Sequence, residues 1–167
     1  MRGSESEEAA EKASLRGRQD PRVEKLIVRA QPGAAVPLRK QRLILGMGVD
    51  IAEVGRVRGV IERQGERFLR RVFTEREIAY CEASKNKYER YAARFAAKEA
   101  AMKALGTGWR RGVRWVDLEV VRQASGRPSM ELRGEARKIA DGLGVKHIAM
   151  SITHTEEQAM AQVIFES

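Results

Sequence analysis

Cysteine is nearly absent from this sequence, and that scarcity limits the chemistry available to it. Cys81 is the single cysteine among 167 residues, and there are two histidines. One cysteine forms neither a disulfide within the chain nor a cysteine-rich zinc site, which is typical of a reducing compartment. No Ser-His-Asp pattern is present, so covalent nucleophilic catalysis is not favoured. We therefore expect a cytoplasmic protein whose chemistry depends on other groups.

Long hydrophobic runs and aromatic side chains are also scarce. No stretch approaches the roughly 18 apolar residues that cross a bilayer, and the N-terminus lacks the apolar segment of a secretory signal. Aromatic residues make up 5% of the chain. That is too few for the stacking platforms of RNA-binding modules, and no RNP or zinc-finger pattern is found. We expect neither a membrane nor a nucleic acid as partner.

Positive charge, by contrast, is abundant. The formal net charge is +9, with 10 Lys and Arg against 6 Asp and Glu in residues 1–44 and 22 against 17 in residues 45–167. Such a chain attracts acidic partners, among them phosphorylated metabolites, acidic proteins, anionic lipids and nucleic acids. Charge alone does not choose among them. A nucleic-acid-binding module therefore stays open as an alternative, against which the few aromatic residues count.

Composition divides the chain near residue 41. Residues 1–41 are of mixed charge, rich in Ala, Gly and Pro, and contain one short apolar patch at 26–28. Such a segment buries too little apolar surface to offset the entropy of ordering it. We predict a disordered extension over residues 1–41 and a folded domain over residues 42–167.

The folded part begins with LILGMGVDI (43–51), which indicates a buried strand. Its glycines, Gly46 and Gly48, suggest a bulge or the close approach of another backbone or a ligand. Apolar residues at helical spacing follow over 53–71. A capping-box pattern at Thr74 predicts a helix that runs to about Cys81.

The second half of the chain has strand signals. A polar connector (84–90) and an Ala-rich helix come first, and Gly106 and Gly108 end that helix. Strict alternation then predicts strands, separated by turns and by one short helix: 116–120, 130–132, helix 134–142, and two strands within 148–165 joined through 154–158. One strand, several helices and a run of antiparallel strands predict an α+β fold.

The Ala-rich helix RFAAKEAAMKALGTG (94–108) places Glu99 beside an apolar arc. A carboxylate there is costly unless it is paired or bound to a cation. Lys103, four residues later, is the stronger explanation on spacing alone. The alternative is a metal site, with Asp50 at the end of the glycine-containing strand as the second carboxylate. Two carboxylates suit Mg²⁺ better than zinc, provided that the fold brings them together.

The glycine run GTGWRRG and His154 each allow two interpretations. Gly106 and Gly108 permit left-handed backbone whose amides can face an anion, with charge added by Arg110 and Arg111. A helix cap followed by a solvated loop explains the same residues almost as well. His154, flanked by Thr153 and Thr155, is either an exposed turn residue or a hydrogen-bond donor to a phosphate.

Taken together and in order, three motifs resemble the bacterial holo-[acyl-carrier-protein] synthase family of small 4'-phosphopantetheinyl transferases, over residues 45–167. They are GMGVDIAEVGR (46–56), RFAAKEAAMKALGTG (94–108), and SGRPSMEL followed by SITHTEEQAMAQVI. The resemblance implies that family's fold, an antiparallel sheet packed with helices. It also implies transfer of phosphopantetheine from coenzyme A to a serine of apo acyl carrier protein in fatty acid synthesis, leaving adenosine 3',5'-bisphosphate.

The resemblance also implies residue roles. Asp50 and Glu99 match the Mg²⁺ ligands and, with Lys103, the catalytic positions. The positions that bind coenzyme A correspond to Arg94, Lys103, Gly106, Gly108, His154 and Thr155. Arg56 matches a position that grips the acidic carrier, and Arg63, Arg67 and Arg70 would extend that surface or form a solvated helix face. Family members form trimers with a shared active site, so a homotrimer is expected.

Some points stay open at this level. The extension of about 40 residues departs from the family pattern, which leaves the true start site and the role of residues 1–41 undecided. Neither the preferred carrier protein, nor the general base, nor a role for Lys98 follows from the sequence. A carrier-binding protein without catalysis is a third interpretation, which the intact Asp50 and Glu99 argue against.

Overall fold

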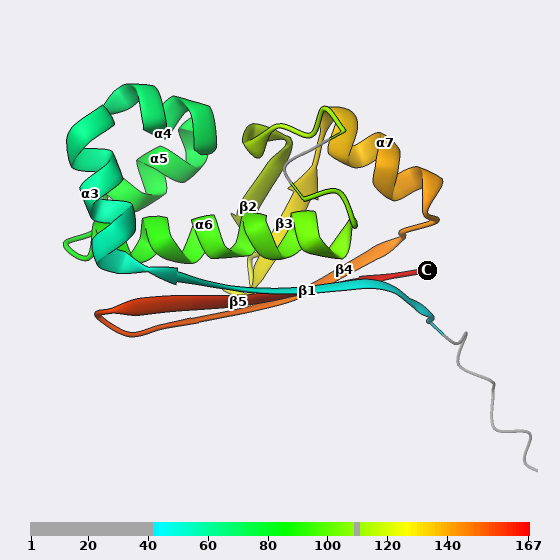
Figure 1. Cartoon of the computed structure of the whole chain (residues 1–167). Coiled ribbons are helices and arrows are strands. Elements are labelled where there is room, and N and C mark those ends of the chain that lie inside the picture. Colours follow the sequence, from blue (N-terminus) through cyan, green and yellow to red (C-terminus); the bar gives the residue numbers. More distant parts are fainter. Residues whose placement is uncertain (1–41, 109–110) are drawn as a thin grey trace, which may run out of the picture. The chain divides into compact units, whose positions relative to one another are not determined.

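The computed structural model describes residues 42–108 and 111–167 (Figure 1). The predicted disorder of residues 1–41 and the expected role of Arg110 therefore lie outside the described residues. The described residues form one compact unit.

Two antiparallel sheets form the framework. The larger sheet has the strand order β1 (Ile44–Glu53), β5 (Gln158–Glu166) and β4 (His147–His154), and the smaller one pairs β2 (Leu118–Arg122) with β3 (Pro128–Leu132). The helical elements are α3 (Val54–Gln64), α4 (Glu66–Val72), α5 (Glu75–Glu82), α6 (Lys87–Ala104), the short 3-10 turn η1 (Trp115–Asp117) and α7 (Gly134–Gly142). The predicted α+β fold is confirmed.

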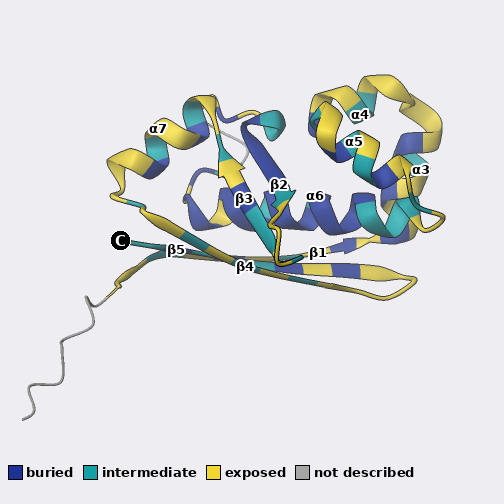
Figure 2. Ribbon diagram, turned by 180° about the vertical axis from the view of Figure 1, so that it is seen from behind, coloured by how far each residue is buried: buried dark blue, intermediate teal, exposed yellow. Residues whose placement is uncertain are grey.

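Helix α6 lies along one face of the larger sheet and is the most buried element (Figures 1 and 2). Every alanine of α6 is buried, and these short side chains let the helix come close to β1. A Cβ atom on Gly46 or Gly48 would collide with the backbone carbonyl oxygens of Ala104 and Ala100, respectively. The two glycines of the first motif therefore serve a close backbone approach, as one of the interpretations predicted, and the strand register shifts between Ile44 and Gly46.

Several predicted boundaries differ from the structure. The helical segment over 53–71 is two helices, because Gly65 has a left-handed φ of 55° and separates α3 from α4. The polar connector over 84–90 is partly wrong, since α6 begins at Lys87. The strand expected from residue 116 begins at Leu118, because Asp117 caps η1 by accepting a hydrogen bond from the Arg114 amide at 3.1 Å.

Helix α5 begins as predicted. The Thr74 hydroxyl accepts a hydrogen bond from the Glu77 amide, and the Glu77 carboxylate accepts one from the Thr74 amide, at 3.3 and 3.0 Å. This reciprocal pair satisfies two amides that the first helical turn would leave unbonded. The predicted capping box is confirmed, and the helix ends at Glu82, one residue beyond the predicted end.

A buried ion pair connects α6 with the neighbouring α5. The Lys98 ammonium, fully buried, lies 2.7 Å from a Glu77 carboxylate oxygen and donates to the Trp115 carbonyl at 3.0 Å. Glu77 also accepts a hydrogen bond from the Val120 amide at 2.9 Å. Burial lowers the pKa of Lys98, while the Glu77 charge acts in the opposite direction. Lys98 thus links α6 to α5 and η1, and Glu77 extends the network to β2, which gives Lys98 a structural role.

The other face of the larger sheet carries no helix in the described part of the chain (Figures 1 and 2). Outward-facing positions of β1 and β5 there bear exposed apolar side chains: Met47, Val49, Ile51 and Met160. We call this set the apolar sheet face. Among the described residues, no helix is long and apolar enough to cross a membrane.

Candidate active site

Two separate cavities contain the side chains that the sequence singled out. The first, of about 480 Å³, lies among β1, α3 and α6, and Asp50, Arg56, Glu99 and Lys103 line it. Asp50 lies two residues from the buried Gly48 and two from the buried Ala52 along β1, so all three are on the same face of the strand. That face packs against α6. Glu99 and Lys103 lie one turn apart on α6. The fold thus brings the two predicted carboxylates together, in what we call the carboxylate cavity.

Lys103 binds Asp50 and not Glu99. Its ammonium lies 2.9 Å from Asp50 Oδ1 and donates to the Val49 carbonyl oxygen, also at 2.9 Å. Burial raises the pKa of Glu99, the nearby Asp50 charge adds to this, and Lys103 opposes it. The Glu99–Lys103 pair that spacing favoured is not among the ion pairs of the described residues. Glu99 therefore has no ion-pair partner among the described residues, although Arg56 and Lys103 both line the cavity.

This donor set fits a hard divalent cation. Mg²⁺ prefers oxygen ligands, usually takes one or two protein carboxylates and completes its shell with water and phosphate oxygens. Asp50 and Glu99 supply such a pair, and a bound cation would oppose both the burial and the Asp50 charge that raise the pKa of Glu99. Within the described ranges no group of three or more His, Cys, Asp or Glu side chains is arranged to hold a metal ion. The residues thus suit Mg²⁺ held largely by non-protein oxygens.

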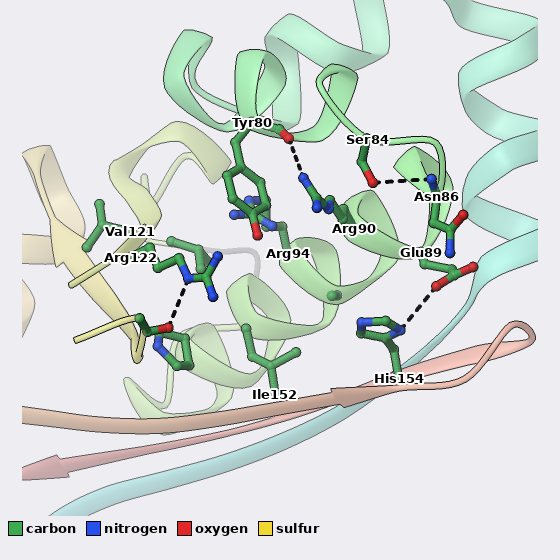
Figure 3. Close-up of a pocket in the computed structure, with 14 residues that line it drawn as sticks. Tyr80, Ser84, Asn86, Glu89, Arg90, Arg94, Val121, Arg122, Ile152 and His154 are labelled. Carbon is green, nitrogen blue, oxygen red and sulfur yellow. Dashed lines mark hydrogen bonds and ion pairs between the residues drawn. The ribbon is translucent and has the colours of Figure 1, made fainter. Parts of the chain in front are cut away.

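The second cavity, of about 420 Å³, contains Arg94 and His154 (Figure 3). Arg94 is 8% exposed, and its buried Nε atom has no hydrogen-bond partner among the described residues. His154 ends β4, and its Nδ1 atom lies 3.2 Å from a Glu89 carboxylate oxygen. We call this the arginine cavity. It shares no lining residue with the carboxylate cavity.

The geometry of α6 explains this separation. Arg94 and Glu99 are five residues apart, which places them about 140° apart around a helix. Arg94 therefore faces the arginine cavity while Glu99 and Lys103 face the carboxylate cavity. The family resemblance assigned these residues to one active site. Within a single chain, however, they line two separate cavities.

The glycines after α6 adopt the expected conformation. Gly106 and Gly108 have φ values of 69° and 54°, so the predicted left-handed backbone is confirmed. Their amides donate back into the helix, to the carbonyls of Lys103 at 3.0 Å and Met102 at 3.2 Å. The helix-cap interpretation therefore accounts for both of these N–H groups. Nearby Arg111 also has a positive φ, of 57°, which is unusual for a residue with a side chain.

Of the remaining predicted residues, Arg56 alone lines one of the two cavities. Thr155 is exposed and stabilises the β4–β5 turn, where its hydroxyl accepts from the Gln158 amide at 3.1 Å. Arg56 lines the carboxylate cavity. The other predicted carrier-binding arginines are exposed on α3 and α4: Arg63, Arg67 and Arg70.

Sequence reasoning missed part of the arginine cavity. Tyr80 from α5, Arg90 from α6 and Arg122 from β2 line it beside Arg94. None of these three belongs to a motif, and Arg90 falls in the segment predicted as a connector. No local sequence pattern marks these residues, because each comes from a different segment and only the fold brings them to one cavity.

Comparison with known proteins identifies the family. Residues 46–163 match the sequence profile of the 4'-phosphopantetheinyl transferase superfamily, and the chain belongs to it. The holo-[acyl-carrier-protein] synthase of Solibacter usitatus is 58% identical over 125 residues, which are 75% of this chain and 100% of that protein. The protein of the same name from Koribacter versatilis is 54% identical over 124 residues, 74% of this chain and 99% of that one.

Solved structures support the same assignment. The crystal structure of holo-[acyl-carrier-protein] synthase from Neisseria meningitidis matches with a TM-score of 0.68 at 30% identity, over 75% of this chain and 100% of that one. The enzyme from Bacillus anthracis, in complex with CoA (3',5'-ADP), matches with a TM-score of 0.61 at 35% identity, over 74% and 97%. The family and the fold predicted from the three motifs are confirmed.

Proposed function

We propose that the chain is a holo-[acyl-carrier-protein] synthase, which transfers 4'-phosphopantetheine from coenzyme A to a serine of apo acyl carrier protein. The serine oxygen forms a bond to the β-phosphorus, the P–O bond within the pyrophosphate breaks, and adenosine 3',5'-bisphosphate leaves as the serine proton is lost. The observation that carries this proposal is the grouping of Asp50, Glu99 and Lys103 in one cavity, in a chain 58% identical to a protein of that name.

In this proposal the carboxylate cavity is where phosphorus is attacked. Asp50 and Glu99 would hold Mg²⁺, which when bound supplies positive charge beside the pyrophosphate. The Lys103 ammonium fixes Asp50 at 2.9 Å and remains half exposed toward solvent. It can therefore also donate to a phosphate oxygen and stabilise charge on the leaving group.

The arginine cavity would bind another part of coenzyme A. Arg94 and His154 provide donors suited to phosphate oxygens. Because this cavity shares no residue with the carboxylate cavity, we propose that each active site combines the carboxylate cavity of one subunit with the arginine cavity of a neighbour in a homotrimer. The apolar sheet face supports assembly, since exposed apolar patches of this kind mark interaction sites.

The carrier protein would approach over α3 and α4. Arg56 lies at the carboxylate cavity, and Arg63, Arg67 and Arg70 are exposed on the same helical segment. Their positive charge complements an acidic carrier and would speed its encounter with the site. The protein would encounter both substrates, coenzyme A and apo carrier protein, in the cytoplasm, which is the location expected from the sequence.

Intact-mass spectrometry of a carrier protein tests the reaction directly. Apo acyl carrier protein is incubated with the full chain, coenzyme A and Mg²⁺, and in parallel with a chelator. We expect the carrier to gain the mass of one phosphopantetheine arm, and the gain to disappear when the metal is removed. If the folded protein modifies no apo carrier under these conditions, the proposed function is wrong.

A further inference from the structure

Three arginines gather in the arginine cavity without a carboxylate partner. Arg90, Arg94 and Arg122 form no ion pair with any carboxylate of the described residues, although they line one cavity (Figure 3). Arg90 donates to the Tyr80 carbonyl and Arg122 to the Gly126 carbonyl, each at 3.0 Å. The acidic residue at the cavity, Glu89, is engaged by His154. Three arginines against one glutamate leave the cavity with a net positive charge, and none of the three has a carboxylate partner among the described residues.

Tyr80 holds two of these arginines. The guanidinium carbons of Arg94 and Arg90 lie 4.0 and 4.5 Å from the centroid of its ring. Stacking on an aromatic ring orients a guanidinium while leaving N–H groups free, and a planar fork of donors matches a phosphate. The buried Nε atom of Arg94 has no partner in the described structure, which is rare for a buried donor. The two oriented guanidinium groups thus form a site suited to an anion.

The chemistry of coenzyme A indicates which anion this is. The molecule carries a pyrophosphate and one phosphomonoester, on the 3'-hydroxyl of its ribose. The pyrophosphate contains the phosphorus that reacts, so it must lie at the carboxylate cavity with Asp50 and Glu99. The phosphomonoester is left for the arginine cavity. It is a dianion near neutral pH with three terminal oxygens, which suits two guanidinium forks.

We propose that Arg90 is a specificity-determining residue that, together with Arg94, clamps the 3'-phosphate of coenzyme A, and that Tyr80 is the positioning residue for both guanidinium groups. This inference rests on the proposed function. It assigns to Arg90 and Tyr80, which belong to none of the three motifs, the ability to distinguish coenzyme A from its 3'-dephospho form.

Steady-state kinetics with the full chain tests Arg90. The wild-type protein should use coenzyme A with a lower KM than 3'-dephospho-coenzyme A. Arg90→Gln should raise the KM for coenzyme A by about tenfold to a hundredfold, the range of a lost charged hydrogen bond. It should leave kcat, and the KM for the dephospho form, within about twofold. Arg137→Gln, which removes an exposed arginine of α7, is the control and should change neither KM.

The outcomes separate this inference from the proposed function. If Arg90→Gln weakens both substrates equally, or neither, Arg90 does not read the 3'-phosphate. If wild-type protein transfers from neither substrate, the proposed function fails. In that case calorimetry with adenosine 3',5'-bisphosphate, AMP and inorganic phosphate still tests the clamp. Tighter binding of the bisphosphate than of AMP, lost in Arg90→Gln, supports it, whereas equal binding of both nucleotides, or binding of inorganic phosphate as tight as that of the bisphosphate, overturns it.

Two substitutions test the positioning role of Tyr80. Tyr80→Phe keeps the ring and should retain the wild-type KM for coenzyme A. Tyr80→Leu removes the ring and should raise that KM by about threefold to thirtyfold, the range of a cation–π contact. The KM for the dephospho form should not change in either variant, which a general loss of structure would not produce. If the Leu and Phe variants have equal KM values for coenzyme A, the ring does not position the arginines.

Discussion

The chemistry proposed for the carboxylate cavity depends on a carboxylate, Glu99, that has no ion-pair partner among the described residues. Lys103 pairs with Asp50 at 2.9 Å, so Glu99 retains a half-buried charge beside a second acid. Such a charge is stabilised by a divalent cation and not by the helix that carries it. The residue that looked misplaced on an Ala-rich helix is therefore the one whose removal should affect metal use most directly.

Glu99→Gln tests this role, because it keeps the side-chain shape and removes the charge. We expect the transfer rate to fall by at least about a hundredfold, as when a metal ligand is lost. The remaining activity should need more Mg²⁺. Glu135→Gln on α7 is a matched control that should keep wild-type activity. If Glu99→Gln retains most of its activity at the same Mg²⁺ concentration, Glu99 is not a metal ligand.

Lys98, next to Glu99 in sequence, should affect stability instead. Lys98→Met leaves the buried Glu77 carboxylate without its cation and should lower the free energy of unfolding by about 3–5 kcal/mol. Adding Glu77→Gln should recover part of this loss. Lys103→Met, on the exposed side of the same helix, should lower stability by less than about 1 kcal/mol and impair transfer. Urea denaturation measures all of these variants, and equal losses for Lys98→Met and Lys103→Met would contradict the structural role of Lys98.

At the scale of elements, the sequence predicted best where local patterns decide the structure. The capping box at Thr74 predicted the start of α5, and the alternation of apolar and polar residues predicted the strands of the β2–β3 and β4–β5 pairs. The break at Gly65 was missed because apolar spacing continues across it. The N-terminal turns of α6 were missed because Lys87–Arg90 is polar in sequence and becomes helical through contacts with α5, such as Arg90 with Tyr80.

Packing of β1 against α6 makes Gly48 sensitive to substitution. Gly48→Ala would push a methyl group into the Ala100 carbonyl and separate strand from helix. We expect a loss of about 1–3 kcal/mol, typical of overpacking. Transfer should also slow, because Asp50 lies two residues further along the strand. Gly142→Ala at the end of α7, where a Cβ meets open space, should change stability by less than about 1 kcal/mol. Thermal unfolding compares the two, and equal midpoints would show that the contact tolerates a side chain.

At the scale of the whole molecule, the apolar sheet face and the divided site lead to the same expectation. Met47 is 58% exposed on β1. If this face joins subunits, Met47→Glu should bury a charge and dissociate the trimer. Light scattering should then give the mass of three wild-type chains and a smaller mass for the variant. Leu143→Glu, the same kind of change at an exposed position after α7, should remain trimeric. A wild-type monomer would rule out the assembly.

The division of the predicted site between two cavities could not be read from the sequence, since motif order does not show which faces of α6 the residues occupy. It can be tested by combining two defects. At a coenzyme A concentration far below the KM of either variant, Glu99→Gln and Arg94→Gln should each keep at most about a tenth of the wild-type rate when expressed alone. Co-expressed, they should regain about a quarter of the wild-type rate. In randomly mixed rings, one interface in four pairs an intact carboxylate cavity with an intact arginine cavity.

A chain with both substitutions supplies the background rate for this experiment, and gel filtration confirms that the mixed assemblies form. A site built within one chain makes the opposite prediction, because every chain in the mixture then carries one defect. The co-expressed sample would stay at background, and the two cavities would have to cooperate within a single subunit. Recovery to about a quarter would instead mean that a lone subunit is inactive, because it carries the two halves of different sites.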